Sequence, residues 1–172
     1  MKKRVKVLET ELRHRSRRLS IKEGIFNSTK LSFGDQYLHP FAIAINASNS
    51  LVAMITSITG IFGPLSQLIG SNAIKKHKRT QILSRATFIE ALTWLLIVLI
   101  GALYIIDIQR ELLPIALIIT FALITFFSNY SYPAWFSLMG ETVDKKNRGR
   151  WFSKRTTINS FIFVIFAILA AL

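Results

Sequence analysis

The sequence LTWLLIVLIGALYII at residues 92–106 and the sequence LLPIALIITFALITFF at residues 112–127, separated only by Asp107 to Glu111, decide the fold of this chain. Neither run contains a charged residue, and a third apolar run extends from Phe161 to Leu172. A helix of about 20 such residues crosses the hydrocarbon core of a bilayer. Lipid admits only helices or closed barrels, and these runs lack the two-residue alternation of a barrel strand. We therefore expect an all-α integral membrane protein.

The basic residues are gathered into clusters that flank the apolar runs. The chain has 22 Lys and Arg against 9 Asp and Glu, and its basic clusters are Met1 to Lys22, Lys75 to Arg79 and Lys145 to Arg155. Cytoplasmic loops of membrane proteins carry such an excess of positive charge. The clusters do not form a stripe with interleaved aromatics, the pattern of a nucleic-acid surface, so nucleic acid is not an expected partner.

Charge also decides how often the chain crosses the membrane. One crossing between the first two basic clusters would put them on opposite sides, whereas two crossings, with a turn at residues 46–50, put both in the cytoplasm. The loop at residues 107–111 has a single basic residue and is placed outside. The predicted organisation is a basic cytoplasmic N-terminal tail at residues 1–22 and a transmembrane domain at residues 23–172, with about five spans at 24–45, 51–70, 81–106, 112–139 and 156–172. Because the last span is barely long enough, we expect a chain truncated before the rest of the protein.

The basic tail has Val5, Leu8 and Leu12 at helical spacing. An apolar stripe against a dense basic face is typical of a helix that lies on an anionic cytoplasmic leaflet. A solvated and partly disordered tail fits the same residues equally well, so both interpretations of the tail stay open.

The first predicted span is unusual because it carries the ionisable residues Lys30, Asp35 and His39. Lys and Asp each cost roughly 2.5 to 3.5 kcal/mol at the centre of a membrane helix. Asp35 and His39 are four residues apart and would share one helical face. We expect that face to line a polar cavity, with Asp35 and His39 as candidates for proton or cation coupling. The alternative is an interfacial stretch, in which Lys30 reaches the membrane surface and a neighbouring helix satisfies Asp35.

Three further polar residues lie inside predicted spans. Glu90 lies well inside the third span and needs a partner or a water-filled cavity. Asn129 follows the apolar run of the fourth span, ahead of Pro133, whose ring loosens the helix. Gln67 lies among glycine and serine residues that favour close helix packing. The substrate and coupling candidates are therefore Asp35, His39, Lys30, Glu90, Asn129 and Gln67.

The sequence carries no enzyme signature. It has no HExxH, no phosphate-binding glycine loop and no GxSxG elbow. It has no cysteine, which excludes disulfides and thiolate metal sites, and His14, His39 and His77 lack metal-ligand spacing. We therefore predict no catalytic activity, no cofactor and no metal.

One loop has the sequence Gly70-Ser-Asn-Ala-Ile-Lys-Lys-His-Lys-Arg79, a glycine followed by a cluster of basic residues. This segment resembles the loop between helices two and three of the major facilitator superfamily of transporters. The family motif has glycine, three residues, aspartate, a basic residue, any residue, glycine and two basic residues. The matching residues are Gly70, Lys75, Lys78 and Arg79. Ile74 replaces the aspartate, which helps to lock the family's cytoplasmic gate, and His77 replaces the second glycine.

A second loop also resembles this family. Pro133-Ala-Trp, followed by Gly140-Glu-Thr-Val-Asp-Lys-Lys-Asn-Arg-Gly-Arg150, is similar to the loop between helices four and five, where an acidic residue precedes Arg-Gly-Arg. The matching loop residues are Asp144, Arg148, Gly149 and Arg150. With the first span, which resembles the family's opening helix at Gly34, Tyr37, Pro40 and Phe41, the resemblance covers about residues 24–172.

The resemblance implies a fold of two six-helix halves with the solute site between them, moving by alternating access. The chain would be the N-terminal portion and would work with the remaining half or another copy. We therefore expect secondary active transport of a small solute across the cell (plasma) membrane, coupled to a proton or ion. The alternative is a non-transporting membrane scaffold or assembly subunit, whose basic loops bind anionic lipid or a cytoplasmic partner.

Overall fold

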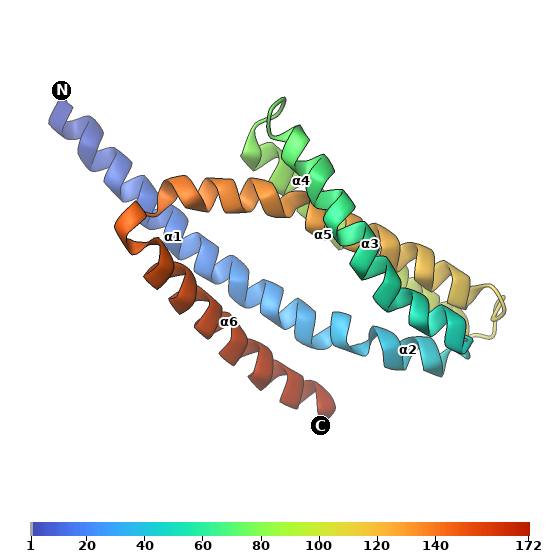
Figure 1. Ribbon diagram of the computed structural model, residues 1–172. Coiled ribbons are helices and arrows are strands. Elements are labelled where there is room, and N and C mark those ends of the chain that lie inside the picture. Colours follow the sequence, from blue (N-terminus) through green and yellow to red (C-terminus); the bar gives the residue numbers. More distant parts are fainter. Residues whose placement is uncertain (1) are drawn as a thin grey trace. The chain divides into compact units, whose positions relative to one another are not determined.

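The computed structural model describes residues 2–172, with side chains from Thr10 onward. Its elements are α1 (Lys2–Phe33), η1 (Asp35–Tyr37), α2 (Leu38–Ala44), α3 (Asn49–Ala73), α4 (Arg79–Ile105), α5 (Leu113–Thr142), η2 (Lys145–Asn147) and α6 (Arg148–Ala171) (Figure 1). Helix accounts for 88% of the structure, and residues 2–172 contain no strand. The predicted all-α class is therefore confirmed. The side chains of Val5 and Leu8, on which the amphipathic reading of the tail depends, lie outside the described residues.

Four helical segments are long and apolar enough to cross a membrane. They are α3, α4, α5 and the segment Lys145–Ala171, which contains α6. The spans predicted at 51–70, 81–106 and 112–139 fall on α3, α4 and α5 with ends that differ by a few residues. The span predicted at 156–172 falls in α6, which begins earlier, at Arg148. These four helices support a multi-pass membrane protein.

The segment predicted as one span at 24–45 is divided between α1, η1 and α2. The break falls at Gly34, a residue with low helix propensity. Pro40 explains why α1 does not simply continue, because its ring would remove a helical hydrogen bond and clash with the carbonyl of residue 36. In the structure Pro40 lies in the first turn of α2, where a missing N–H costs nothing. Upstream, α1 passes residue 22 without interruption, so no structural break marks the end of the basic tail.

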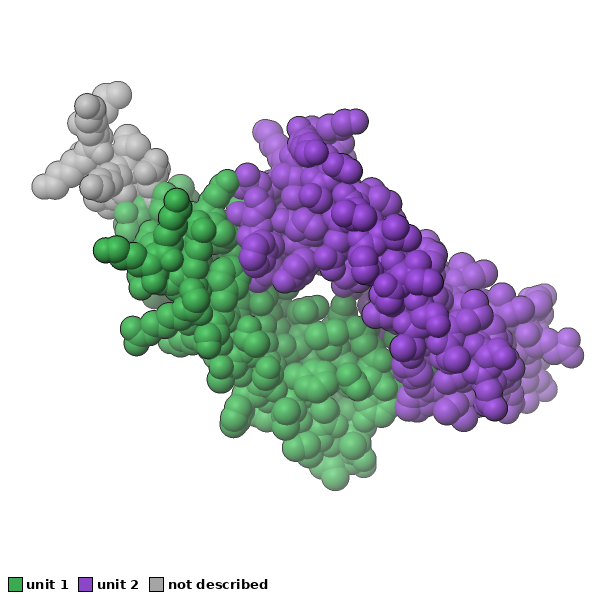
Figure 2. Space-filling model, viewed as in Figure 1, with its two compact units in different colours: residues 1–38, 138–172 green, residues 39–137 purple. Residues whose placement is uncertain are grey.

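The chain divides into two compact units (Figure 2). Unit 1 consists of residues 1–38 and 138–172 and contains α1 and α6. Unit 2 consists of residues 39–137 and contains α3, α4 and most of α2 and α5.

In unit 1, α1 and α6 lie side by side and run in the same direction (Figure 1). Contacts advance along both helices together: Arg155 Nε donates to the carbonyl of Ser20 at 3.2 Å, and Ser32 Oγ donates to the carbonyl of Phe163 at 2.9 Å. Phe33 and Phe166 then meet with ring centroids 5.7 Å apart. The basic start of α6 therefore lies beside the basic part of α1, which agrees with the prediction that both clusters share one side of the membrane.

A row of small residues forms the α1 side of this contact. Ser20, Gly24, Ser28 and Ser32 follow one another at intervals of four residues, and all are buried. Residues at this interval share a helical face. A Cβ atom added at Gly24 would collide with the side chain of Asn159. Small residues at such positions let two helix backbones approach closely, which is how helices commonly associate in lipid.

Unit 2 packs α3, α4 and α5 around apolar residues. Its buried apolar side chains include Ile55, Ile58, Ile82, Ile100, Leu117 and Ile124. Gly70 of α3 lies so near the carbonyl oxygen of Tyr130 of α5 that an added Cβ would clash with this backbone atom. Ser48 caps the start of α3 by accepting a hydrogen bond from Leu51 N.

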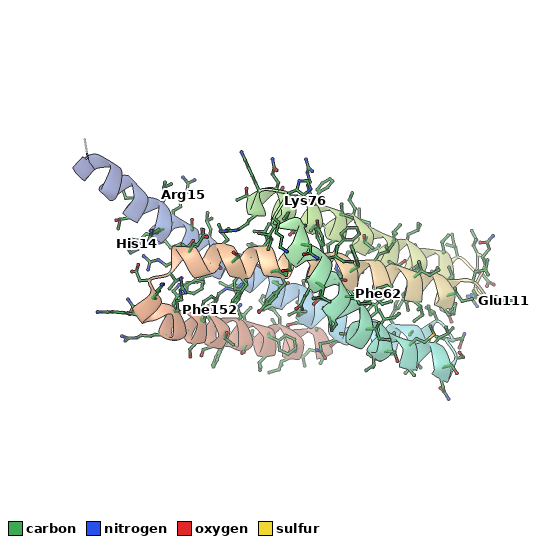
Figure 3. The ribbon with its side chains drawn as sticks, turned by 45° about the horizontal axis from the view of Figure 1, so that its top comes forward. His14, Arg15, Phe62, Lys76, Glu111 and Phe152 are labelled. Carbon is green, nitrogen blue, oxygen red and sulfur yellow. The ribbon has the colours of Figure 1, made fainter. Side chains whose placement is uncertain are left out.

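The two ends of unit 2 are distinct. Asn46, in the left-handed region at φ 61°, donates from Nδ2 to the hydroxyl of Tyr104 at 3.1 Å. The turn after α2 and the loop after α4 therefore lie at the same end, as expected of two loops on one side of a membrane. Lys76 and Glu111 lie at opposite ends of this unit (Figure 3).

Candidate functional site

Two of the predicted polar residues meet within unit 2. Gln67 Nε2 of α3 donates to Asn129 Oδ1 of α5 at 3.0 Å, and Asn129 Nδ2 donates to the carbonyl of Thr125 at 2.9 Å. Gly63 of α3 lies beside Asn129, whose amide would be in ordinary van der Waals contact with an added Cβ, at 3.7 Å. Sequence reasoning selected both residues but did not predict their contact. The pair joins two predicted spans through side-chain amides.

Glu90 is the acidic residue of α4, and it lies well inside the span predicted at 81–106. Its residue is 8% exposed and belongs to a buried row with Ala86 and Thr93. At 1.5 Å per residue, Glu90 lies about 17 Å from the start of α4, close to the middle of the helix. Thr93 uses its hydroxyl to donate to the carbonyl of Ile89 at 2.8 Å. A carboxylate on the packed face of an apolar helix is a group that membrane proteins retain for function.

The structure does not place Asp35 and His39 on one continuous helical face. Asp35 begins η1 and is half-buried, whereas His39 belongs to α2 and is exposed. His39 Nε2 lies 3.3 Å from Thr56 Oγ1 of α3. The expected shared face required a regular α-helix through residues 35–39, whereas the chain changes from the 3-10 turn η1 to α2 at Leu38, between the two residues.

Lys30 lies in the last turn of α1 and is half-buried. A cation in the last turn interacts favourably with the negative end of the helix dipole. Along α1, Lys30 lies between Gly24, which is next to Asn159 of α6, and Ser32, which donates to the carbonyl of Phe163 of α6. Lys30 therefore lies alongside the apolar part of α6.

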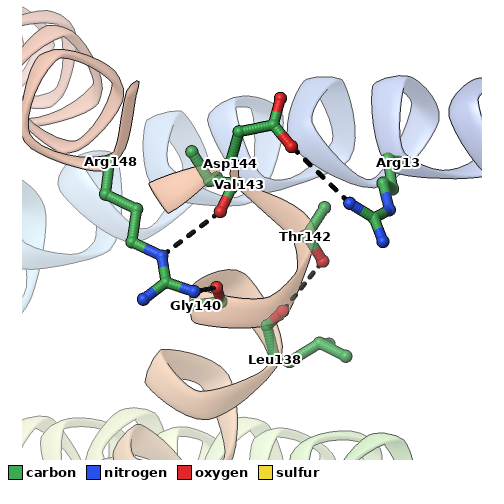
Figure 4. A network of polar contacts seen from close by, with 7 residues as sticks. All are labelled: Arg13, Leu138, Gly140, Thr142, Val143, Asp144 and Arg148. Carbon is green, nitrogen blue, oxygen red and sulfur yellow. Dashed lines mark hydrogen bonds and ion pairs between the residues drawn. The ribbon is translucent and has the colours of Figure 1, made fainter. Parts of the chain in front are cut away.

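The second loop that carries the resemblance forms a polar network in unit 1 (Figure 4). Arg148 donates from Nε to the carbonyl of Val143 at 3.2 Å and from Nη2 to the carbonyl of Gly140. These are carbonyls near the end of α5, which lack partners within the helix. Asp144 pairs with Arg13 of α1 at 3.6 Å, with both side chains more than half exposed. Arg148 therefore closes the end of α5, while Asp144 links this loop to α1.

The remaining loop residues have simpler surroundings. Gly70 supports the close approach to Tyr130. Lys75 Nζ lies 3.2 Å from Asn72 Oδ1, and Lys78 is the residue before the first turn of α4. Gly149 has open space where a Cβ would lie, in contrast to Gly70. Of the two glycines that match the family's motifs, Gly70 and Gly149, Gly70 is the one whose added Cβ would clash with a neighbouring atom.

Sequence reasoning missed the ion pair between α1 and α6. Arg155 Nη2 and Glu23 Oε2 are 2.7 Å apart, and the Arg155 side chain is only 14% exposed. The signal was present as the four-residue repeat of Ser20, Gly24 and Ser28, which marks a packing face on α1. Among the described residues, no group of three or more His, Cys, Asp or Glu side chains could hold a metal ion.

No family model, curated protein or solved structure matches this chain.

Proposed function

We propose that the chain is part of a secondary active transporter, related to the major facilitator superfamily, that moves a small solute by alternating access coupled to a proton or ion. The observation that carries this proposal is the burial of Glu90 at the middle of α4. An ionisable residue in a membrane helix is costly, and such residues usually face a bundle interior where they serve ion or substrate pathways.

The amide pair supports the same proposal. Gln67 and Asn129 present donors and acceptors within an otherwise apolar unit. Such side chains fix the orientation of a polar solute when a site opens around them. In this proposal Glu90 couples transport to the proton or ion gradient, and Gln67 and Asn129 contribute to solute binding. Lys30, Asp35 and His39 are further candidates from the first crossing.

A fifth crossing, with the N-terminus in the cytoplasm of a cell (plasma) membrane, belongs to this proposal. The part of α1 from Ser20 to Phe33 lies beside α6 between Arg155 and Phe166. Because α6 lies in a candidate membrane span, this part of α1 reaches the same depth. Together with α2 it provides the first crossing. The basic residues of α1 and of the start of α6 then lie on the cytoplasmic side, as the positive-inside rule requires.

The alternative function is a membrane scaffold or assembly subunit, and one observation favours it. The amides of Gln67 and Asn129 are bonded to each other, which is how polar residues strengthen helix packing without any solute. In that case the basic loops would bind lipid or a cytoplasmic partner. The two functions differ in whether water and solute reach the level of Glu90.

The test is solute uptake into sealed vesicles that contain the protein, driven by an imposed pH gradient, with proton movement followed by a pH-sensitive dye. Glu90→Gln should abolish gradient-driven uptake at unchanged membrane abundance. Glu111→Gln is the matched control, because Glu111 is an exposed carboxylate in a loop, and it should retain uptake. Equal uptake by both variants would remove Glu90 from the mechanism, and no uptake of any solute by the unaltered protein would favour the scaffold.

A further inference from the structure

One face of α6 points away from α1. Arg155, Asn159, Phe163 and Phe166 make the contact with α1. At 100° per residue, the opposite side of the helix carries Arg150, Lys154, Thr157, Phe161, Ile165 and Ile168. All six are exposed. We call this row the outer face of α6.

The outer face changes character along its length. It begins with two cations, Arg150 and Lys154, and has a hydroxyl at Thr157. Beyond Thr157 it is purely apolar, with Phe161 70% exposed and Ile168 58% exposed. None of the residues of α6 is buried. An exposed apolar row of this kind in a membrane helix needs an apolar partner, which lipid or another helix can supply.

The spacing of charges and apolar residues matches one leaflet of a bilayer. From Lys154, Phe161 lies about 10 Å and Ile165 about 17 Å along the helix axis. Half of the hydrocarbon core of a bilayer is about 15 Å thick. A phospholipid whose phosphate lies at Lys154 would thus place its acyl chains against Phe161 and Ile165.

We propose that the outer face of α6 binds an anionic phospholipid, with its phosphate between Arg150 and Lys154 and its acyl chains along Phe161, Ile165 and Ile168. The two exposed cations favour a lipid over a protein helix as the occupant. A protein helix would have to place an acidic side chain beside them, whereas an anionic headgroup already carries the negative charge. Lys and Arg side chains near a membrane surface extend their apolar stems along the helix and keep the charge at headgroup level. Each such cation attracts an anionic leaflet.

The test uses a tryptophan at the apolar part of the face. Phe161→Trp is made in a background where Trp94, Trp135 and Trp151 are replaced by Phe, and the full chain is reconstituted into bilayers. Quenching of this tryptophan is compared between phosphatidylglycerol and phosphatidylcholine that carry brominated acyl chains. We expect the brominated anionic lipid to bind several-fold more tightly at Phe161 than the zwitterionic lipid. The double variant Arg150→Gln/Lys154→Gln should lower this preference by about 5-fold for each charge removed.

Three controls separate a site from general attraction. The swap Arg150→Lys/Lys154→Arg should keep the preference, and so should Arg15→Gln/Lys76→Gln, which removes the same charge from exposed residues elsewhere. A reporter at Leu99 of α4, which is exposed and has no Lys or Arg within ten residues, should show no preference. Equal preference at Leu99 and Phe161 would overturn the site. Absence of quenching by either lipid at Phe161 would also overturn it, because another protein segment would then cover the face.

Discussion

Unit 1 and unit 2 hold their helices together by different contacts. In unit 1 the contact between α1 and α6 is polar, with an ion pair between Arg155 and Glu23 and a hydrogen bond from Ser32 to a carbonyl. In unit 2 the contact is made by buried isoleucine and leucine residues and by a glycine against a backbone carbonyl. Gln67 of α3 and Asn129 of α5 form a hydrogen-bonded side-chain pair within this apolar contact.

The difference follows from what drives helix association in lipid. Lipid tails are as apolar as leucine, so burial of apolar surface gives little advantage, and association depends on close packing and hydrogen bonds. Both units use close packing, at Gly24 in unit 1 and at Gly70 in unit 2, and unit 1 adds an ion pair and a hydrogen bond between its helices. A substitution should therefore cost most where it blocks a backbone approach, and least where it removes an exposed ion pair.

The largest expected effect is at Gly70. Gly70→Ala places a Cβ against the carbonyl oxygen of Tyr130, and a backbone atom cannot rotate away as a side chain can. We expect a loss of about 3 kcal/mol, the upper part of the range for overpacking. The measurement is thermal unfolding of the detergent-solubilised protein. The folded fraction at each temperature is the fraction that still elutes as a monodisperse peak.

Gly60→Ala in the same helix is the control, because open space surrounds that position. It should be neutral or slightly stabilising, since alanine has the higher helix propensity. If Gly70→Ala and Gly60→Ala unfold at the same temperature, the close approach of α3 to α5 does not stabilise unit 2.

The next effect is at the ion pair of unit 1. Arg155→Gln removes donors to Glu23 and to the carbonyl of Ser20, and should cost about 1.5 to 3 kcal/mol, as expected for hydrogen bonds to a charged group. Loosening of α1 should be visible as faster trypsin cleavage after Arg17 or Arg18. Lys154→Gln is the matched control, because it removes an adjacent exposed charge. Cleavage at equal rates in both variants would contradict the role of Arg155.

A smaller effect is expected for the amide pair of unit 2. In a double-mutant cycle of Gln67→Ala and Asn129→Ala, the coupling free energy should be about 0.6 kcal/mol and at most about 1.7, the range for hydrogen bonds between membrane helices. Unfolding of the single and double variants in the same detergent gives this value. Strict additivity of the two single variants would show that the bond does not stabilise the unit.

The smallest effect is expected at Arg13 and Asp144. Both side chains are more than half exposed and their charged atoms are 3.6 Å apart, so Arg13→Gln should change stability by about 0 to 1 kcal/mol. The effect should disappear at high salt, because salt screens exposed charges. A loss as large as that of Arg155→Gln would contradict the expectation that this exposed pair contributes less to the stability of unit 1 than the pair of Arg155 with Glu23.

The sequence was sufficient to predict the helices of unit 2. An uncharged run such as residues 92–106 is expected to form a helix in lipid, and in the structure this run lies in the second half of α4, which ends at Ile105. The first span could not be read in this way, because the competition between continuing α1 and accommodating Pro40 is decided by local geometry. Hydropathy also gave no sign that the segment of α1 from Ser20 to Phe33 would lie beside α6.

The candidate site was predictable residue by residue, but its contacts were not. Glu90 and Asn129 were conspicuous because each interrupts an apolar run, and the structure buries Glu90 and bonds Asn129 to Gln67. The predicted common face of Asp35 and His39 depended on a regular α-helix, but Asp35 lies in the 3-10 turn η1 and His39 in α2. Contacts between residues far apart in sequence depend on how helices pack, and the period of a single helix does not contain that information.

The transport proposal requires water to reach the level of Glu90, and this can be measured without knowing the solute. The chain has no cysteine, so a single introduced thiol reports alone. Thr93→Cys lies one turn from Glu90, and Leu99→Cys lies at an exposed apolar residue of the same helix. With Glu111→Cys in the loop as the labelling standard, a membrane-impermeant maleimide should label Thr93→Cys from one side of the membrane and leave Leu99→Cys unlabelled. If Glu111→Cys is labelled and Thr93→Cys is unlabelled from both sides, no water pathway reaches Glu90 and the chain is not a transporter of this kind.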